Sequence, residues 1–159
     1  MGPRFVADSM LGRLARWLRA FGFDVEYHSS GDDHEMIARA RQRAAIVLTR
    51  DTRMPRPSDV RVLFIRCDRV EDQLAQVAAE APLDLSNARP LTRCTVCNGP
   101  LVPATRDDIW DKVPPFVYLT QERYARCPCC GRVYWEGTHA PRIRRQLQRL
   151  TVAAHREGK

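Results

Sequence analysis

Lysine is nearly absent from this sequence of 159 residues, because every basic side chain except Lys112 and Lys159 is an arginine. The planar guanidinium of arginine binds phosphate through two hydrogen bonds at once, whereas an ammonium acts as a point charge. No stretch approaches the roughly 20 apolar residues of a membrane-spanning helix. We therefore expect no membrane contact, and a content of 44% hydrophobic and 28% charged residues is typical of a soluble globular chain.

The N-terminal stretch MGPRFVADSML lacks the basic region, apolar segment and small-residue cleavage site of a secretory signal. We therefore expect a cytoplasmic protein. At this length the chain forms one ordinary domain, or a compact domain with a small appendage.

The charge is distributed unevenly along the chain. Basic residues number 26 and acidic residues 19, which gives a net charge of +7. Before residue 91 the counts are 14 and 13, and from residue 91 onward they are 12 and 6. A basic face favours binding to nucleic acid or another polyanion, although an arginine-rich genome composition produces part of the same bias.

Strand-like and helix-like segments alternate through the first half of the chain. RFVAD and AAIVLT are short buried apolar runs, while SMLGRLARWLRAFG places leucines at helical spacing and ends at a glycine. Such alternation predicts a mainly parallel sheet with helices packed on its faces. The predicted strands are residues 4–8, 23–28, 44–49 and 61–67, and the predicted helices are residues 9–22, 32–43 and 70–81.

The pattern changes after Ala81, where PLDLSNARPLTRC is polar and punctuated by prolines. We therefore predict four parts. They are an α/β domain in residues 1–82, a linker in residues 83–91, a cysteine-rich unit in residues 92–140, and a basic C-terminal helix and tail in residues 141–159.

Two Cys-x-x-Cys knuckles mark the cysteine-rich unit, CTVC and CPCC, with 29 residues between Cys97 and Cys127. Each two-residue spacer aims both sulfurs at one ion, and four thiolates close a tetrahedron around zinc without an open position for water. We expect a structural Zn²⁺ site, and disulfides or a redox pair are the less favoured alternative in a cytoplasmic chain. The predicted ligands are Cys94, Cys97, Cys127 and Cys130.

Three details of the zinc unit follow from the same segment. Cys129 lies between the second pair and is the alternative to Cys130, which keeps the two-residue spacing. Gly99 and Gly131 follow the knuckles, where the turns need positive φ. VPPFVYL, residues 113–119, is expected to build hairpin strands of a ribbon.

Acidic residues follow two of the predicted buried strands. Asp8 comes after the first strand and Asp51 after the third, so their carboxylates converge if the strands are neighbours. Asp33 and Glu35 open the intervening helix. Carboxylate oxygens suit Mg²⁺ or Mn²⁺, and such a site supports metal-assisted cleavage of a phosphodiester.

Each acid also has a local structural alternative. Asp8 or Ser9 caps the helix that begins near Met10, and Asp51 heads a turn. Asp32 caps the next helix, with Glu35 three residues on as in a capping box. The spacing alone does not decide between these roles and metal binding.

Six arginines are candidates for contact with nucleic acid. Arg13, Arg16 and Arg19 recur on one face of the first helix, which is most simply a solvated face. In the last helix, Ile143, Leu147 and Leu150 form the packing side. Arg50 and Thr49 flank Asp51, where we expect them to contact phosphate and a metal-bound water. The six candidates are Arg13, Arg16, Arg50, Arg142, Arg144 and Arg145.

Three segments together resemble one ribonuclease family, namely residues 5–27, residues 32–51, and the two knuckles with the YWEGTH that follows. This is the PIN-like family named for the C-terminal RNase domain of mutator-type (Mut-seven) exonucleases, and the resemblance covers nearly the whole chain. It implies a three-layer α/β/α PIN-like domain in residues 1–82, a zinc ribbon in residues 92–140, and divalent-metal-dependent RNA cleavage.

The resemblance also implies residue roles. It makes Asp8, Asp33 and Asp51 the metal ligands, with Glu35 as a fourth candidate. Neither Asp59 nor Asp68 matches the further acid that a full PIN site has after its third strand. The cysteines match the zinc ligands of the family.

The leading hypothesis is therefore a metal-dependent ribonuclease whose zinc ribbon and basic helix hold RNA. The first rival is a non-catalytic RNA- or ribosome-associated adaptor in which the acids only cap helices. A receiver-like domain with Asp51 as phosphoacceptor is ranked last, because the N-terminal half has no lysine. Trp135 and His139 stack on a base or complete the core of the ribbon, and the structural role is preferred.

Overall fold

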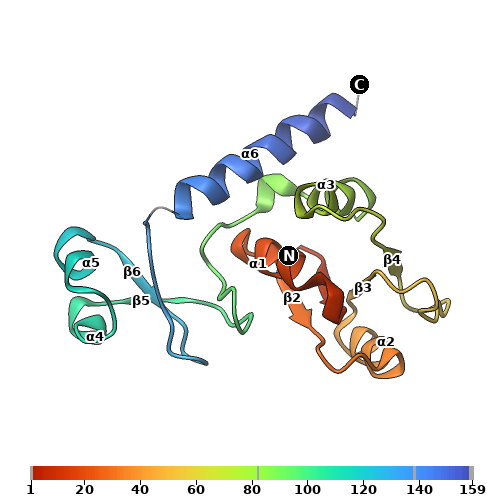
Figure 1. The fold of residues 1–159 in the computed structure, drawn as a ribbon, viewed down its shortest axis with the longest axis horizontal. Helices are drawn as coiled ribbons and strands as arrows, with labels where there is room; N and C mark the ends of the chain where they lie inside the picture. Colours follow the sequence, from red (N-terminus) through yellow and green to blue (C-terminus); the bar gives the residue numbers. More distant parts are fainter. Residues whose placement is uncertain (1, 82, 138, 158–159) are drawn as a thin grey trace.

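A computed structural model describes residues 2–81, 83–137 and 139–157 of the chain. Its N-terminal part contains a parallel four-stranded sheet in the order β2-β1-β3-β4, which confirms the predicted α/β fold (Figure 1). The strands are β1 (Arg4–Ala7), β2 (Asp24–Tyr27), β3 (Ile46–Thr49) and β4 (Val62–Phe64). The helices of this part are a 3-10 turn η1 (Ser9–Leu11), α1 (Gly12–Ala20), α2 (Asp33–Arg43) and α3 (Val70–Glu80).

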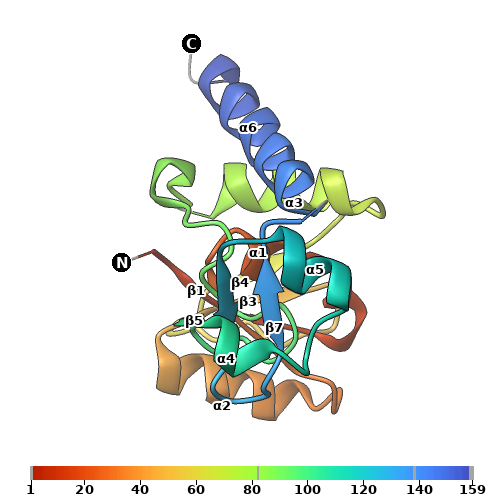
Figure 2. The ribbon, with the colours of Figure 1, turned by 90° about the vertical axis from the view of Figure 1, so that its left-hand side faces the viewer.

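The sheet is buried on both faces. Successive side chains of a strand point to opposite sides, so each strand contributes to both faces. In β1, Phe5 and Ala7 belong to a core cluster with α1 and α3, whereas Val6 belongs to a second cluster with α2. Figure 2 shows α2 on one side of the sheet and α1 and α3 on the other. This is the expected three-layer arrangement.

The connection from β3 to β4 contains no helix between residues 50 and 61. Pro55 and Pro57 remove backbone donors from this segment and disfavour a helix there. Met54 and Val60 are buried in the cluster on the α2 face, so the crossover is fixed by apolar contacts.

The cysteine-rich unit is an antiparallel sheet of β5 (Val102–Ala104), β6 (Tyr124–Arg126) and β7 (Val133–Trp135). Two short helices, α4 (Arg106–Ile109) and α5 (Pro115–Thr120), lie between β5 and β6. The expectation that VPPFVYL forms strands is therefore wrong. Pro115 occupies the first turn of α5, where its missing N–H costs nothing and its fixed φ favours a helix.

The C-terminal helix α6 (His139–Glu157) packs on the N-terminal part of the chain (Figure 1). Leu150 is buried in the core cluster that includes α1 and α3, and Ile143 and Leu147 pack against it, which confirms the predicted packing side. The 3-10 turn η2 (Leu85–Asn87) also contacts α6, so the segment predicted as a linker is itself packed. None of the described helices is long and apolar enough to cross a membrane.

Candidate functional site

The carboxyl ends of β1 and β3 form the place where the strand order reverses. The chain runs from β1 to β2 on one side and then returns to β3 on the other side of β1. Strands β1 and β3 pair directly, with Ala7 opposite Leu48. Asp8 follows β1 and Asp51 lies two residues after β3, so the expected neighbourhood of their strands is confirmed. In open α/β sheets, ligands bind in the crevice at such a switch point.

Asp8 is buried, and its carboxylate accepts three hydrogen bonds. The residue is only 7% exposed. Its Oδ1 accepts a hydrogen bond from Met10 N at 2.9 Å. Oδ2 accepts from Thr49 Oγ1 at 2.7 Å and from Arg50 N at 2.8 Å. Asp8 therefore caps η1, as its local alternative predicts, and also joins the end of β1 to the end of β3.

Asp51 is more open than Asp8. Its side chain is 32% exposed, and Oδ1 accepts a hydrogen bond from Arg53 N at 2.8 Å, which is the turn geometry foreseen for it. Its backbone N donates to Thr49 Oγ1 at 3.0 Å. Within the described residues, the second carboxylate oxygen of Asp51 has no hydrogen-bond partner.

The start of α2 carries the other two acids. Asp32 caps the helix by accepting from His34 N and Glu35 N, as its sequence position indicates. Asp33 is half-buried in the first turn, and Glu35 is exposed with Oε2 3.5 Å from His28 Nε2. Sequence reasoning overlooked His28, although it stands directly after the β2 segment and its ring is only 11% exposed.

The carboxylates do not form a closed cluster. Across residues 2–81, 83–137 and 139–157, the four predicted cysteines are the one group of three or more His, Cys, Asp or Glu residues whose ligand atoms lie within 4.8 Å of one another. Mg²⁺ usually keeps several waters and takes one or two carboxylates together with substrate phosphate. Asp8 and Asp51 at adjacent strand ends fit that donor requirement.

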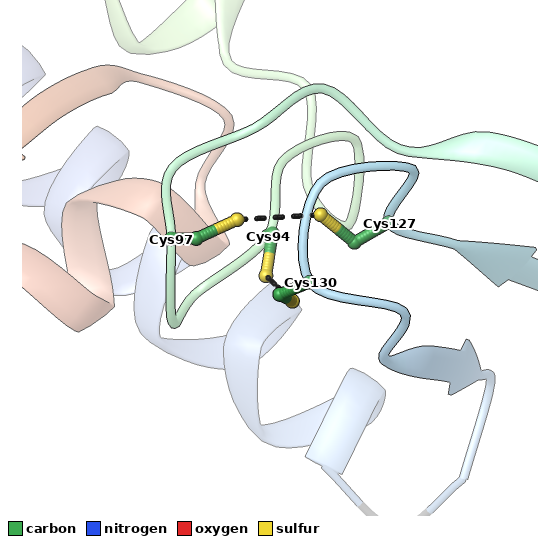
Figure 3. Close-up of side chains that lie close together, drawn as sticks. All are labelled: Cys94, Cys97, Cys127 and Cys130. Atoms are coloured by element: carbon green, nitrogen blue, oxygen red, sulfur yellow. Dashed lines mark hydrogen bonds between the residues drawn. The ribbon is translucent and has the colours of Figure 1, made fainter.

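The cysteine cluster has the geometry of a zinc centre. Figure 3 shows the sulfurs of Cys94, Cys97, Cys127 and Cys130 pointing toward one another from the two knuckles. Cys94 Sγ lies 3.7 Å from Cys130 Sγ, and Cys97 Sγ lies 3.3 Å from Cys127 Sγ. Zn–S bonds of about 2.3 Å separate the sulfurs of a tetrahedral site by about 3.8 Å. All six cysteines are free thiols, so the disulfide alternative is not realised.

The turns of the knuckles differ in one respect from expectation. Gly131 has the predicted positive φ of 77°, but in the first knuckle the positive φ of 69° belongs to Asn98 and not to Gly99. Gly99 is needed for another reason, because a Cβ there would lie 3.2 Å from Cys129 Sγ and 3.4 Å from two further sulfurs. Cys129 is exposed and outside the group of four.

Tyr134 supports the first knuckle, and sequence reasoning did not identify it. Its hydroxyl lies 3.0 Å from Cys94 Sγ and accepts a hydrogen bond from Thr95 N at 3.2 Å. Burial raises the pKa of Cys94, but the Tyr134 hydroxyl and the backbone N–H groups of residues 96 and 97 outweigh it and lower the pKa to about 6. Such a thiol is readily ionised for metal binding.

Arg19 corrects the prediction that the arginines of α1 share a solvated face. Arg19 is only 6% exposed, while Arg13 and Arg16 are exposed as expected. Its guanidinium donates to Val25 O at 2.8 Å and to the carbonyls of Thr95 and Val96 at 3.1 Å each. Burial lowers the pKa of Arg19, and the charges of Cys94 and Cys97 oppose this effect. Arg19 therefore connects α1, β2 and the first knuckle.

Asn98 makes a second connection between the knuckle and the sheet. It accepts a hydrogen bond from Val25 N at 3.0 Å, which satisfies a donor on the edge strand β2, and donates to Asp24 Oδ1 at 2.7 Å. Burial raises the pKa of Asp24, but the hydrogen bonds from Asn98 and Arg43 outweigh it and lower the pKa. The cysteine-rich unit is thus docked against the N-terminal sheet by specific polar contacts.

The arginines proposed for nucleic-acid contact lie in different surroundings. Arg50 donates to Ile65 O and to Asp68 Oδ1, so its side chain is held against the end of β4. Arg142 lies over the Trp17 ring, with its guanidinium carbon 5.4 Å from the ring centre. The other arginines of the predicted set, Arg13, Arg16, Arg144 and Arg145, are exposed.

The structure also places four other residues with sequence-predicted roles. Asp59 pairs with Arg41, and Asp68 pairs with Arg50 at 2.6 Å, so each carboxylate has an arginine partner. Trp135 packs against the small core of the zinc unit around Ile109, Val113 and Tyr124, as its structural role predicts. His139 is exposed at the start of α6.

Comparisons with known proteins give one family and one relative. The family model of the Mut7-C RNAse domain matches residues 3–147. The chain is 37% identical over 102 residues to the exonuclease mut-7 homolog of Homo sapiens. That alignment covers 60% of this chain and 12% of the human protein, so the chain matches only a small part of that longer relative. No solved structure matches the chain.

Proposed function

Because the chain belongs to the Mut7-C RNAse domain family, which supports a nuclease role, we propose that it is a ribonuclease that hydrolyses RNA phosphodiester bonds with the help of divalent metal ions. The observation that carries the site is the position of Asp8 and Asp51 at the ends of adjacent strands. The crevice of an open parallel sheet lies at this edge.

The proposed metal ligands are Asp8 and Asp51, with Asp33 and Glu35 approaching from the first turn of α2. When bound, Mg²⁺ or Mn²⁺ activates water and neutralises charge on the scissile phosphate. Thr49 and the backbone N–H of Arg50 fix the Asp8 carboxylate, so it keeps its orientation without help from the substrate. Asp51 presents a free oxygen and a partly exposed side chain toward solvent and substrate.

The zinc centre has a different proposed task. Four cysteine ligands leave no open position for water or substrate, so Zn²⁺ stabilises the ribbon and takes no part in the reaction. The ribbon and α6 aid RNA binding through arginine. The proposed contacts on α1 and α6 are Arg13, Arg16, Arg142, Arg144 and Arg145, with Arg50 beside the catalytic acids.

Metal dependence is tested by adding metal and not by chelation, because a strong chelator also removes zinc. Zinc-loaded protein is freed of other divalent ions and incubated with labelled single-stranded and structured RNA. Addition of Mg²⁺ or Mn²⁺ is expected to start cleavage. Asp33→Asn and Glu35→Gln are compared in the same assay, with Asp107→Asn on the exposed face of α4 as control. Cleavage without added metal would contradict the proposal.

The second candidate function is an RNA-binding adaptor without catalytic activity. It is favoured by the local contacts of the acids, since Asp8 and Asp32 cap helices and Asp51 closes a turn. RNA that is bound but stays intact with every metal would support the adaptor. In that case the acids would serve only the fold.

A further inference from the structure

A groove of about 610 Å³ lies between the N-terminal domain, the zinc unit and the first turns of α6. Its walls come from α1, from β7 with the residue before it, and from α6. Ligand pockets in proteins usually have volumes of about 300 to 1,000 Å³. The side chains that matter here are Arg16, Trp17, Arg132, Tyr134, Trp135 and Arg142.

The charge of this groove has one sign. Arg16, Arg132 and Arg142 line it, together with His139, and none of the described lining residues is acidic. Each of the three arginines comes from a different element, namely α1, the turn before β7, and α6. Guanidinium groups bind phosphate through two hydrogen bonds at once. The groove therefore selects an anionic ligand.

Aromatic side chains give the groove its second property. Trp17, Tyr134 and Trp135 line it, and all three are only half-buried. Trp17 is held on one side by Phe21, with the ring centres 5.8 Å apart, and the Arg142 guanidinium lies over its ring. Aromatic rings and stacked guanidinium planes are the usual partners of unstacked RNA bases.

The walls of the groove are fixed relative to one another. Arg19 and Asn98 dock the first knuckle against α1 and β2, and Leu147 and Leu150 pack α6 onto the N-terminal core. The groove is thus formed before any ligand arrives, which reduces the entropic cost of binding.

We propose that this groove binds a segment of single-stranded RNA, with its phosphates on Arg16, Arg132 and Arg142 and a base against Trp17 or Trp135. A duplex keeps its bases stacked and does not offer them to these side chains. The inference rests on the proposed ribonuclease function, because it assigns a place where the RNA substrate is held outside the carboxylate site.

The first test compares two double variants that remove the same charge. Arg132→Gln with Arg142→Gln removes one arginine of the zinc unit and one of α6 from the groove. Arg123→Gln with Arg156→Gln removes one exposed arginine from each of the same two regions outside the groove. Binding of a labelled single-stranded RNA is measured by fluorescence anisotropy on zinc-loaded protein without Mg²⁺ or Mn²⁺.

We expect the groove variant to bind RNA about tenfold more weakly than the control variant. The slope of log affinity against log salt should fall by about 1.4 in the groove variant, since two phosphate contacts to a single strand are lost. Zinc content and the thermal midpoint are recorded for both variants. Equal loss of affinity in the two variants would overturn the proposal.

The second test needs no change in the groove. The chain has three tryptophans, and Trp110 is 68% exposed and lies outside the groove, so in Trp110→Phe both remaining tryptophans line it. Single-stranded RNA should then quench tryptophan emission with the dissociation constant seen by anisotropy. RNA binding without any change in emission would contradict the proposal, and a free mononucleotide that quenches as strongly as RNA would make the ligand a nucleotide.

These binding tests are independent of cleavage. A protein that binds RNA in the groove and cuts nothing would remove the ribonuclease and leave the groove assignment standing. If the groove variant and the control variant cut RNA equally well and bind it with equal affinity, the groove assignment alone would be contradicted.

Discussion

The cysteine cluster and the carboxylates at the sheet edge both consist of residues that bind metals, but they are built in different ways. The four sulfurs lie within 4.8 Å of one another. No three of the described carboxylates come that close, and Asp8 and Asp51 each accept a hydrogen bond from a neighbouring backbone N–H group. The cysteines could supply all four ligands of one metal ion, whereas the proposed carboxylate site would take water and substrate as further ligands.

This difference suits the two sites to different roles. Four thiolates in one place repel one another unless a cation offsets their charge, so the cluster is suited to hold Zn²⁺ permanently. Under the proposed function, the carboxylate edge exchanges water and substrate, as catalysis requires. Loss of a cysteine should therefore affect the fold, and loss of Asp51 should affect the chemistry.

The largest expected effect is the loss of the zinc centre. Cys130→Ser removes one of four ligands, and structural zinc contributes about 10 to 16 kcal/mol of apparent binding free energy in small domains. We expect the variant to lose zinc and the order of residues 92–137, measured by metal analysis and near-UV circular dichroism. Cys129→Ser is the matched control and should retain zinc. Equal zinc loss in both variants would show that Cys129 is a ligand.

The next effect concerns the joint between the two regions. Arg19→Ala leaves the carbonyls of Val25, Thr95 and Val96 without their buried donor. We expect the free energy of unfolding to fall by about 2 to 4 kcal/mol, measured by urea denaturation. Arg16→Ala on the same helix should change it by less than about 0.5 kcal/mol. Similar values for the two variants would show that Arg19 does not couple the regions.

A smaller loss of stability is expected at Asp8. Asp8→Asn keeps the shape of the side chain but replaces one of its two acceptor oxygens by an NH₂ group, which faces either Met10 N or Arg50 N, so one of these backbone donors loses its acceptor. The free energy of unfolding should fall by about 1 to 3 kcal/mol in a denaturation experiment. An unchanged unfolding midpoint would mean that Asp8 does not join β1 to β3. Because this variant changes stability as well as a proposed ligand, it tests catalysis less cleanly than Asp51.

Much of the architecture follows from sequence patterns that act locally. The alternation of strands and helices predicted the layers, and the two-residue spacing of the cysteines predicted the four clustered thiols, because both patterns report nearby geometry. The prediction of strands for VPPFVYL was wrong. Its β-branched and aromatic residues favour strands, but Pro115 starts a helix.

Contacts between segments that are distant in the chain could not be predicted from the sequence. Arg19 was placed on a solvated face, since helical spacing does not reveal that the first knuckle packs 76 residues further along the chain against the same position. Tyr134 and Asn98 likewise act across units, and nothing in their local sequence marks these roles. The positions of Asp8 and Asp51 after buried strands were accessible, but their hydrogen-bond partners were not.

The smallest expected change in stability is at Asp51, where Asp51→Asn should shift the free energy of unfolding by less than about 0.5 kcal/mol. Its carboxylate is partly exposed, and among the described residues its polar partner is Arg53. Thermal denaturation of zinc-loaded protein measures this, and a large loss of stability would give Asp51 a structural role.

The most direct test measures cleavage and stability together in wild type and Asp51→Asn. Both proteins are loaded with zinc and incubated with labelled RNA and Mn²⁺ or Mg²⁺, and their unfolding midpoints are recorded under the same conditions. The account predicts that wild type cuts the RNA and that Asp51→Asn binds RNA and unfolds at the same temperature but loses cleavage by at least about a hundredfold. Retained cleavage in Asp51→Asn would contradict the assignment of the carboxylate edge as the catalytic site.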